Sequence, residues 1–302
     1  MSSTKTLIVI AGPTAVGKTE LAIKVARHFD TEIVSADSRQ IYKELEIGTA
    51  KPTEEELSMV THHFINTKSI QENYDAGTYA REARGVIDQL FKTHDYLVMC
   101  GGSGLYIKAV TEGFDDLPEV SDVIRSLVIA DYNLKGLLWL QEEVASHDPD
   151  YFEVVDRHNP QRLMRALEVI RSSGKTFSGF RKKEKIDLPF KVIKIGLELE
   201  REELYKRIDD RMDKMISQGL FEEAEKFFTL RHLNSLQTVG YQEPFGFFEG
   251  AFDREEAIRL MKRNSRRYAK RQMTWFKKDG EINWFGSGDI MKILNVIKDG
   301  SV

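Results

Sequence analysis

Cysteine is nearly absent from this sequence of 302 residues, because Cys100 is its only one. One cysteine excludes a disulfide within the chain and a zinc site made of several cysteines, and it is typical of a cytoplasmic protein. Long apolar segments are missing as well. Residues 7–11 form the longest apolar run near the start and are too short for a signal peptide or a membrane span, so we expect no membrane role.

The sequence also has no excess of basic residues. The chain has 44 Lys and Arg residues against 48 Asp and Glu residues, which gives a net charge of -4 at pH 7. Since phosphate-rich partners are normally bound by an excess of basic side chains, this total argues against a polyanion partner. The composition is otherwise ordinary, with 41% hydrophobic and 30% charged residues, and the length suits one large domain or two modest ones.

Short apolar runs alternate with helical patterns in the first hundred residues. Residues 7–11, 32–36 and 96–100 are apolar and rich in β-branched side chains, which is typical of strands buried on both faces. Apolar residues with helical spacing follow Lys18, at Leu21, Ala22, Val25 and Ala26, and a further helical stretch is expected over residues 79–91. This order predicts an α/β fold with an open parallel sheet flanked by helices.

Helical signals replace strand signals between residues 113 and 189. Asn159 followed by Pro160 is a typical helix start, and Gly174 is a typical stop. We therefore predict a mostly helical insertion domain at 113–189.

The sheet is expected to resume after the insertion. Residues 191–197 have a strand pattern, and long helices are predicted over 202–219 and from 254 to about 277. The predicted core domain thus comprises residues 1–112 and 190–302.

A phosphate-binding motif follows the first predicted strand. The G-x-x-x-x-G-K-[ST] pattern is complete, and it lies between a strand and a helix as the motif requires. Its residues are Gly12, Pro13, Thr14, Ala15, Val16, Gly17, Lys18 and Thr19. Loop N–H groups and the helix N-terminus bind phosphate oxygens, Lys18 adds a cation, and the Thr19 hydroxyl can ligate Mg²⁺. The pattern predicts a P-loop NTPase-like core; a glycine-rich turn without ligand is the alternative.

The acidic residue of nucleoside triphosphate hydrolases is missing from its usual place. Such enzymes position their metal with a carboxylate at the end of another strand, but residues 99–104 contain none. Asp37 follows the second predicted strand, so it should face the same crevice as Lys18. It could act as a general base, contact Mg²⁺ through water, or only cap the next turn, and these alternatives stay open.

Positive charge is concentrated in two segments. Residues 151–185 carry nine Lys and Arg against four Asp and Glu, and residues 254–278 carry ten against two. The local charges are +5 and +8, which leaves -17 on the other 242 residues. Each segment is either a solvated helix face or a surface for nucleic acid.

The predicted helix in the second segment has two faces. We expect an apolar seam of Ile258, Met261, Tyr268 and Trp275, and a basic face of Arg259, Arg263, Arg266 and Lys270.

An ordered series of motifs runs through nearly the whole chain. It comprises residues 12–19, 35–42 (SADSRQIY), 47–52 (IGTAKP), 101–106 (GGSGLY), 159–168, 239–243 (VGYQE) and 269–276. Taken together, this series resembles the tRNA dimethylallyltransferases, also called tRNA isopentenyltransferases. With one cysteine, the chain is similar to the bacterial form, which has no zinc finger.

The resemblance implies transfer of a dimethylallyl group from dimethylallyl diphosphate to N6 of the adenine 3′-adjacent to the anticodon, with release of diphosphate. Asp37 would be the general base, Ser103 would hydrogen-bond the leaving oxygen, and Arg211 would help neutralise the diphosphate. It also implies a cytoplasmic monomer without an obligate protein partner, which uses Mg²⁺ and binds the tRNA anticodon stem-loop. The implied tRNA contacts are Asp37, Ser38, Arg39, Gln40, Ser103, Arg125, Gln161, Arg162, Leu163, Met164 and Arg165.

Three rival functions share some of these features. A small-molecule or nucleotide kinase has the same phosphate loop and sheet but needs ATP and no RNA. A non-catalytic RNA-binding protein would use only the basic segments. A prenyltransferase acting on free adenylate would share the chemistry but not the large polyanionic acceptor.

Overall fold

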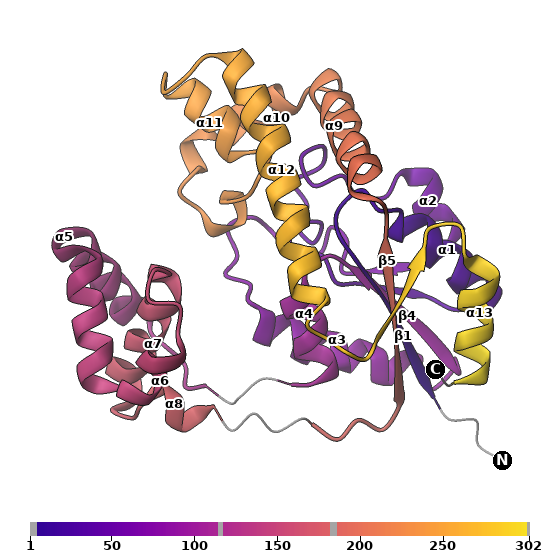
Figure 1. Ribbon diagram of the computed structural model, residues 1–302, viewed down its shortest axis with the longest axis horizontal. Coiled ribbons are helices and arrows are strands. Elements are labelled where there is room, and N and C mark those ends of the chain that lie inside the picture. The colour runs from indigo at the N-terminus through magenta and orange to yellow at the C-terminus, as the bar shows by residue number, and fades with distance from the viewer. Residues whose placement is uncertain (1–4, 114–116, 182–185, 301–302) are drawn as a thin grey trace. The chain divides into compact units, whose positions relative to one another are not determined.

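The computed structural model in Figure 1 describes residues 5–113, 117–181 and 186–300. The chain forms two compact units: unit 1 comprises Met1–Thr111 and Asp187–Val302, and unit 2 comprises Glu112–Ile186. The domains predicted from the sequence, with the insertion at 113–189, stay a prediction, since compactness alone does not establish independent folding.

Unit 1 is built on a sheet of six parallel strands in the order β3-β2-β4-β1-β5-β6. The strands are β1 (Thr6–Ala11), β2 (Ile33–Ser35), β3 (His62–His63), β4 (Tyr96–Gly101), β5 (Lys191–Glu198) and β6 (Ile282–Gly286). The predicted open parallel sheet is therefore confirmed. The edge strands β3 and β6 were not predicted, because they are short and only partly buried.

Helices cover both faces of this sheet. Within β1, Leu7 and Val9 pack on the side of α3 and α4, whereas Ile8 and Ile10 pack on the side of α1 and α13. This double burial explains the continuous apolar pattern of the strand. The helices of unit 1 are α1 (Lys18–His28), α2 (Glu54–Met59), α3 (Ala76–Leu90), α4 (Gly104–Thr111), α9 (Arg201–Ser217), α10 (Leu220–Lys226), α11 (Gln242–Phe248), α12 (Arg254–Phe276) and α13 (Ile290–Asp299), with short 3₁₀ turns η1 (Phe228–Leu230) and η2 (Asn234–Leu236).

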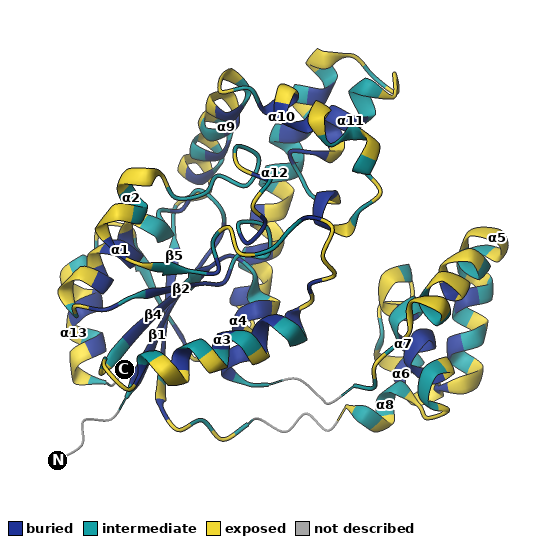
Figure 2. Cartoon of the chain, turned by 180° about the vertical axis from the view of Figure 1, so that it is seen from behind, coloured by how far each residue is buried: buried dark blue, intermediate teal, exposed yellow. Residues whose placement is uncertain are grey.

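Figure 2 shows the resulting pattern of burial, with dark strands inside helices that expose their outer faces. Across the three described ranges, we find no helix that has both the length and the apolar character needed to cross a membrane.

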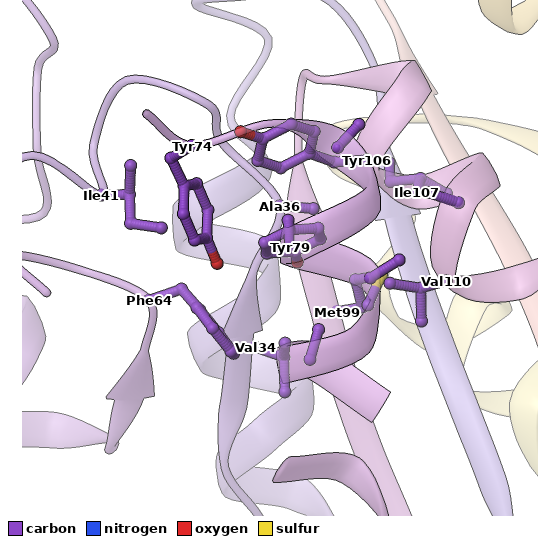
Figure 3. Packing of buried hydrophobic residues seen from close by; sticks show 14 of the residues in the cluster. Val34, Ala36, Ile41, Phe64, Tyr74, Tyr79, Met99, Tyr106, Ile107 and Val110 are labelled. Atoms are coloured by element: carbon purple, nitrogen blue, oxygen red, sulfur yellow. The ribbon is translucent and has the colours of Figure 1, made fainter. Parts of the chain in front are cut away.

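Aromatic packing fixes the end of β2. Tyr79 of α3 stacks on Tyr106 of α4 with ring centroids 4.2 Å apart, and both lie in the apolar cluster of Figure 3. The hydroxyl of Tyr79 donates a hydrogen bond of 2.8 Å to the carbonyl of Ser35, the last residue of β2. The segment that carries Asp37 therefore begins at a buried position whose backbone is held in place by Tyr79.

The described residues of unit 2 form helices joined by loops and include no strand, as the sequence predicts. It consists of α5 (Asp122–His147), which is interrupted at Gly136, α6 (Pro149–Val154), α7 (Pro160–Ser173) and α8 (Phe177–Phe180). The predicted limits of α7 are confirmed: the Asn159 side chain accepts a hydrogen bond from the Arg162 N–H, and Gly174 ends the helix with φ 68°.

The predicted apolar seam of α12 is wrong in part. The helix buries Ala257, Met261, Ala269, Gln272 and Phe276, whereas Tyr268 and Trp275 are 37% and 41% exposed. From Met261 onward the predicted seam advances in seven-residue steps, and a straight helix of 3.6 residues per turn drifts by about 20° per heptad away from such a line.

Two arginines of the predicted basic face of α12 form ion pairs with acidic side chains of unit 1. Arg266 binds Asp209 with N–O distances of 2.6 and 2.7 Å, and Arg259 forms an ion pair with Glu256. Part of the local charge of +8 is therefore neutralised within unit 1.

Candidate functional site

A cavity of about 410 Å³ lies in unit 1, where the carboxyl ends of the strands meet the phosphate loop. Nine predicted site residues line it: Thr14, Ala15, Lys18, Thr19, Asp37, Ser38, Arg39, Gln40 and Arg211. The fold thus brings the phosphate loop, the segment after β2 and the middle of α9 to one place, as expected for ligands of open α/β sheets.

The phosphate loop has the geometry that its motif requires. Gly17 adopts a left-handed conformation with φ 102°, which favours glycine and turns the chain into α1 at Lys18. Val16 is fully buried in the core, so its side chain supports the loop from beneath. The helix N-terminus and the loop amides together form a site for an anion.

Positive charge in the cavity comes from Lys18 and Arg211. The pKa of Lys18 is lowered to about 8, mainly by burial and to a smaller extent by the charge of Arg211, whereas Cys100 and Asp37 oppose the shift. Burial also lowers the pKa of Arg211, against the opposing effect of Asp37. The Lys18 ammonium donates a 2.6 Å hydrogen bond to the Pro13 carbonyl. These partly desolvated cations are well suited to bind a phosphorylated ligand.

Asp37 combines two of the alternatives that the sequence left open. Its Oδ1 accepts hydrogen bonds from the N–H groups of Arg39 (2.9 Å) and Gln40 (3.2 Å), so it does cap the following turn. It also lines the cavity with Lys18, and its Oδ2 has no hydrogen bond from any described residue. The turn therefore orients the carboxylate while one oxygen remains available to a ligand.

Several residues expected to touch substrate are engaged within unit 1. The Ser103 hydroxyl accepts from the Ser38 N–H at 3.0 Å and donates to the Ser38 hydroxyl, and Ser103 does not line the cavity. Arg39 donates to the carbonyls of Asn234 and Ser235. Gln40 donates to the carbonyls of Thr49 and Ala50. These contacts brace the cavity walls, and the expected substrate contacts of Ser103, Arg39 and Gln40 stay predictions.

Gln272 occupies a position that sequence reasoning missed. Its Oε1 accepts a 2.9 Å hydrogen bond from the Thr14 N–H, and its Nε2 donates one of 2.9 Å to the Gly102 carbonyl. A side chain at residue 102 would collide with Gln272, which explains the glycine there. Where nucleoside triphosphate hydrolases carry an acidic residue after a strand, this protein has a neutral amide that ties the loop to β4 and α12. The only signal in the sequence was the family motif at residues 269–276.

The donors present fit Mg²⁺ bound together with a phosphorylated ligand. Thr19 and Asp37 both line the cavity. Mg²⁺ keeps several waters and commonly takes one or two protein oxygens plus phosphate oxygens, so it needs no larger protein cage. Accordingly, the described parts of the chain hold no cluster of three or more His, Cys, Asp or Glu residues suited to a metal.

The RNA contacts expected in unit 2 differ in availability. Gln161 and Arg162 are exposed on the first turn of α7, and Arg162 forms no ion pair with a described residue. Arg165 pairs with the buried Glu168 at 3.3 Å. Leu163 is fully buried in the core of unit 2 and Met164 is half-buried, and the RNA contacts expected of these two residues stay predictions.

Arg125 lies on α5, and its guanidinium is 3.6 Å from the carboxylate of Asp122. Its side chain is exposed, so this weak pair leaves the expected RNA contact open.

A second hollow in unit 1, of about 440 Å³, lies along the last turns of α12. It is lined by Arg267, Lys270, Arg271, Thr274, Trp275 and Lys278. This concentration of cations beside an indole is suited to a nucleic-acid strand, through phosphate attraction and stacking.

Known proteins resemble this chain along its length. The family described as IPP transferase matches residues 40–279. A tRNA dimethylallyltransferase of Cytophaga hutchinsonii is 50% identical over 97% of each chain. The full-length tRNA isopentenylpyrophosphate transferase of Bacillus halodurans has 35% identity and a TM-score of 0.73, covering 98% of this chain and 96% of that one.

A structure of a eukaryotic dimethylallyltransferase acting on tRNA has a TM-score of 0.81 and covers 99% of this chain and 81% of its own. At 24% identity, it supports the fold alone. The family match and the closely aligned bacterial relatives, together with the cavity, decide the assignment. The chain belongs to the IPP transferase family, that of the tRNA dimethylallyltransferases.

Proposed function

We propose that this protein transfers a dimethylallyl group from dimethylallyl diphosphate to N6 of the adenine 3′-adjacent to the anticodon of tRNA. One observation carries the proposal: a single cavity joins the phosphate loop with Lys18, the cation of Arg211 and the carboxylate of Asp37. The first two suit a diphosphate leaving group, and the third suits the proton that the acceptor must lose.

The chemistry balances with these groups. The adenine nitrogen attacks the allylic carbon, a C–N bond forms, and the C–O bond to diphosphate breaks. Negative charge collects on the departing oxygens, where Lys18, Arg211 and the loop N–H groups stabilise it. Asp37 accepts the N6 proton through the oxygen that its turn leaves free. When Mg²⁺ is bound by Thr19 with the diphosphate, it supplies further positive charge there.

Recognition of tRNA is assigned to two groups of side chains. Gln161, Arg162 and Arg165 on α7 would contact the anticodon stem-loop, since RNA sequence is recognised chiefly in single-stranded regions. The hollow on α12 would add phosphate contacts. The target adenine must leave its stack to react, at a cost of a few kcal/mol that these contacts would offset.

A labelling experiment tests the proposal. Radiolabelled dimethylallyl diphosphate and unmodified tRNA are incubated with the protein and Mg²⁺, and label in RNA is counted. We expect label in tRNA that disappears with Asp37→Ala. Absence of label together with ATP-dependent phosphorylation of a metabolite would favour a kinase, and AMP outcompeting tRNA as acceptor would favour a free-adenylate prenyltransferase.

A further inference from the structure

A buried carboxylate outside the phosphate loop connects two walls of the cavity. Glu223 lies on α10 and is 7% exposed. One wall contains residues 48–50, and the other contains residues 237–239 and 242. Neither wall segment belongs to the sheet, so both need other support to keep their shape.

The first wall is held through its backbone. The carboxylate of Glu223 accepts hydrogen bonds from three consecutive N–H groups, those of Glu46 (3.2 Å), Ile47 (2.8 Å) and Gly48 (3.0 Å). Hydrogen bonds to a charged acceptor are about twice as strong as neutral ones, and their loss would leave these partly buried N–H groups without their protein acceptor.

The second wall is held through Tyr241, which is fully buried. Its hydroxyl donates a 2.6 Å hydrogen bond to Glu223, and its ring lies against Gly48. Burial and the Glu223 charge raise the pKa of Tyr241, so the hydroxyl remains a donor at any physiological pH. Tyr241 directly precedes Gln242 and follows the lining residues 237–239.

We propose that Glu223, with Tyr241, is a positioning pair that sets the two cavity walls opposite the phosphate loop and thereby aligns the allylic carbon with its acceptor. This inference rests on the proposed function. The phosphate-binding groups lie on other elements, α1 and α9, so loosening the walls should affect the transfer step more than diphosphate binding. A misplacement of about 1 Å can cost roughly 100-fold in rate.

The first experiment compares Glu223→Gln with Glu225→Gln, a matched change at an exposed position of the same helix. We expect kcat to fall about 10- to 100-fold in the first variant, with KM for dimethylallyl diphosphate and the Kd for inorganic pyrophosphate within about threefold of wild type. The control should keep wild-type kinetics. An unchanged kcat, or equal losses of kcat and pyrophosphate affinity, would overturn the proposal.

The second experiment uses Tyr241→Phe, which keeps the buried ring and removes one donor. We expect a smaller loss of kcat and faster hydrogen exchange at the amides of residues 46–48. Unchanged exchange there contradicts the bracing role, even if the Glu223 variant fails to fold. If the wild-type protein transfers nothing to tRNA, the proposed function fails instead, while pyrophosphate binding and hydrogen exchange still test the positioning of the walls.

Discussion

Affinity for the diphosphate substrate should fall steeply above pH 8, because the pKa of Lys18 is lowered to about 8 by burial. The protonated ammonium attracts the diphosphate, and the bound anion in turn holds the proton on Lys18. As pH rises through 8, Lys18 of the free protein loses this proton, so the free energy of protonating Lys18 again is subtracted from the free energy of binding. The dissociation constant for the diphosphate substrate therefore rises with pH.

The magnitude comes from the fraction of Lys18 that is protonated. Between pH 7.5 and 9.5, a group with a pKa of about 8 loses nearly all its charge, which predicts an increase in Kd of about 25-fold. Other groups of the cavity stay constant in this range. Burial of Cys100 and partial burial of Tyr268 at the cavity raise the pKa of each to about 12, arginine stays charged, and phosphate groups have already lost their second proton, whose pKa is about 6.

Calorimetry measures this dependence without turnover when it uses an analogue of dimethylallyl diphosphate in which a methylene group replaces the oxygen between the allylic carbon and phosphorus. Lys18→Arg is the control, because its guanidinium stays charged and its Kd should change little between pH 7.5 and 9.5, whatever its absolute affinity. A wild-type Kd that stays flat up to pH 9.5 would refute the reasoning. An equal rise in the arginine variant would also refute it, since the titrating group would then not be Lys18.

Three further predictions concern the acceptor side, the RNA contacts and the loop. Asp37→Asn, which keeps the turn-capping oxygen, should lower the single-turnover rate about 10²- to 10⁴-fold with little change in tRNA affinity, and a normal rate would remove Asp37 from the role of base. Arg162→Ala should weaken tRNA binding and reduce by about 1 the slope of log binding constant against log salt concentration, as measured by titrations at several salt concentrations. Arg165→Ala should reduce this slope less, because Glu168 already neutralises the Arg165 charge. Arg171→Ala is the control and should leave the slope unchanged, because its guanidinium binds Asp131. Gln272→Ala should weaken binding of the diphosphate analogue roughly three- to tenfold, since a charge-neutral hydrogen bond contributes about 1 kcal/mol, and an unchanged Kd would show that the loop needs no tie to β4.

The parts of the site that sequence could predict are those set by short-range order. The phosphate loop lies between β1 and α1, so strand, turn and helix are contiguous and their patterns locate Lys18 and Thr19. Asp37 was placed correctly because the carboxyl ends of parallel strands share one edge of the sheet. The limits of α7 were predicted from its cap residues, because these lie directly next to the helix in the sequence.

The parts that could not be predicted depend on contacts between distant segments. Gln272 reaches Thr14 across 258 positions, and Glu223 reaches Gly48 across 175. No periodicity encodes such pairs. Arg211 was located only through the family resemblance, because a single arginine on a charged helix has no local signature. The predicted seam of α12 failed because seven-residue steps drift away from one face of a straight helix, and the face that is buried is the one that packs against α9 and α11.

The structure shows where part of the positive charge is concentrated. The total of -4 argued against a polyanion partner, but the excess of cations on α12 and just after it places Arg267, Lys270, Arg271 and Lys278 around one hollow. An acidic body with local basic surfaces would favour one orientation of a bound RNA over others.

Transfer to a defined position in RNA tests the central claim most directly. Two anticodon stem-loops are compared, one with adenine 3′-adjacent to the anticodon and one with a purine that lacks the N6 amino group at that position. With labelled dimethylallyl diphosphate and Mg²⁺, we predict label only in the adenine-containing RNA, at that nucleotide, with one diphosphate released per group transferred. Label in both RNAs, or in neither while diphosphate is released, would contradict the account.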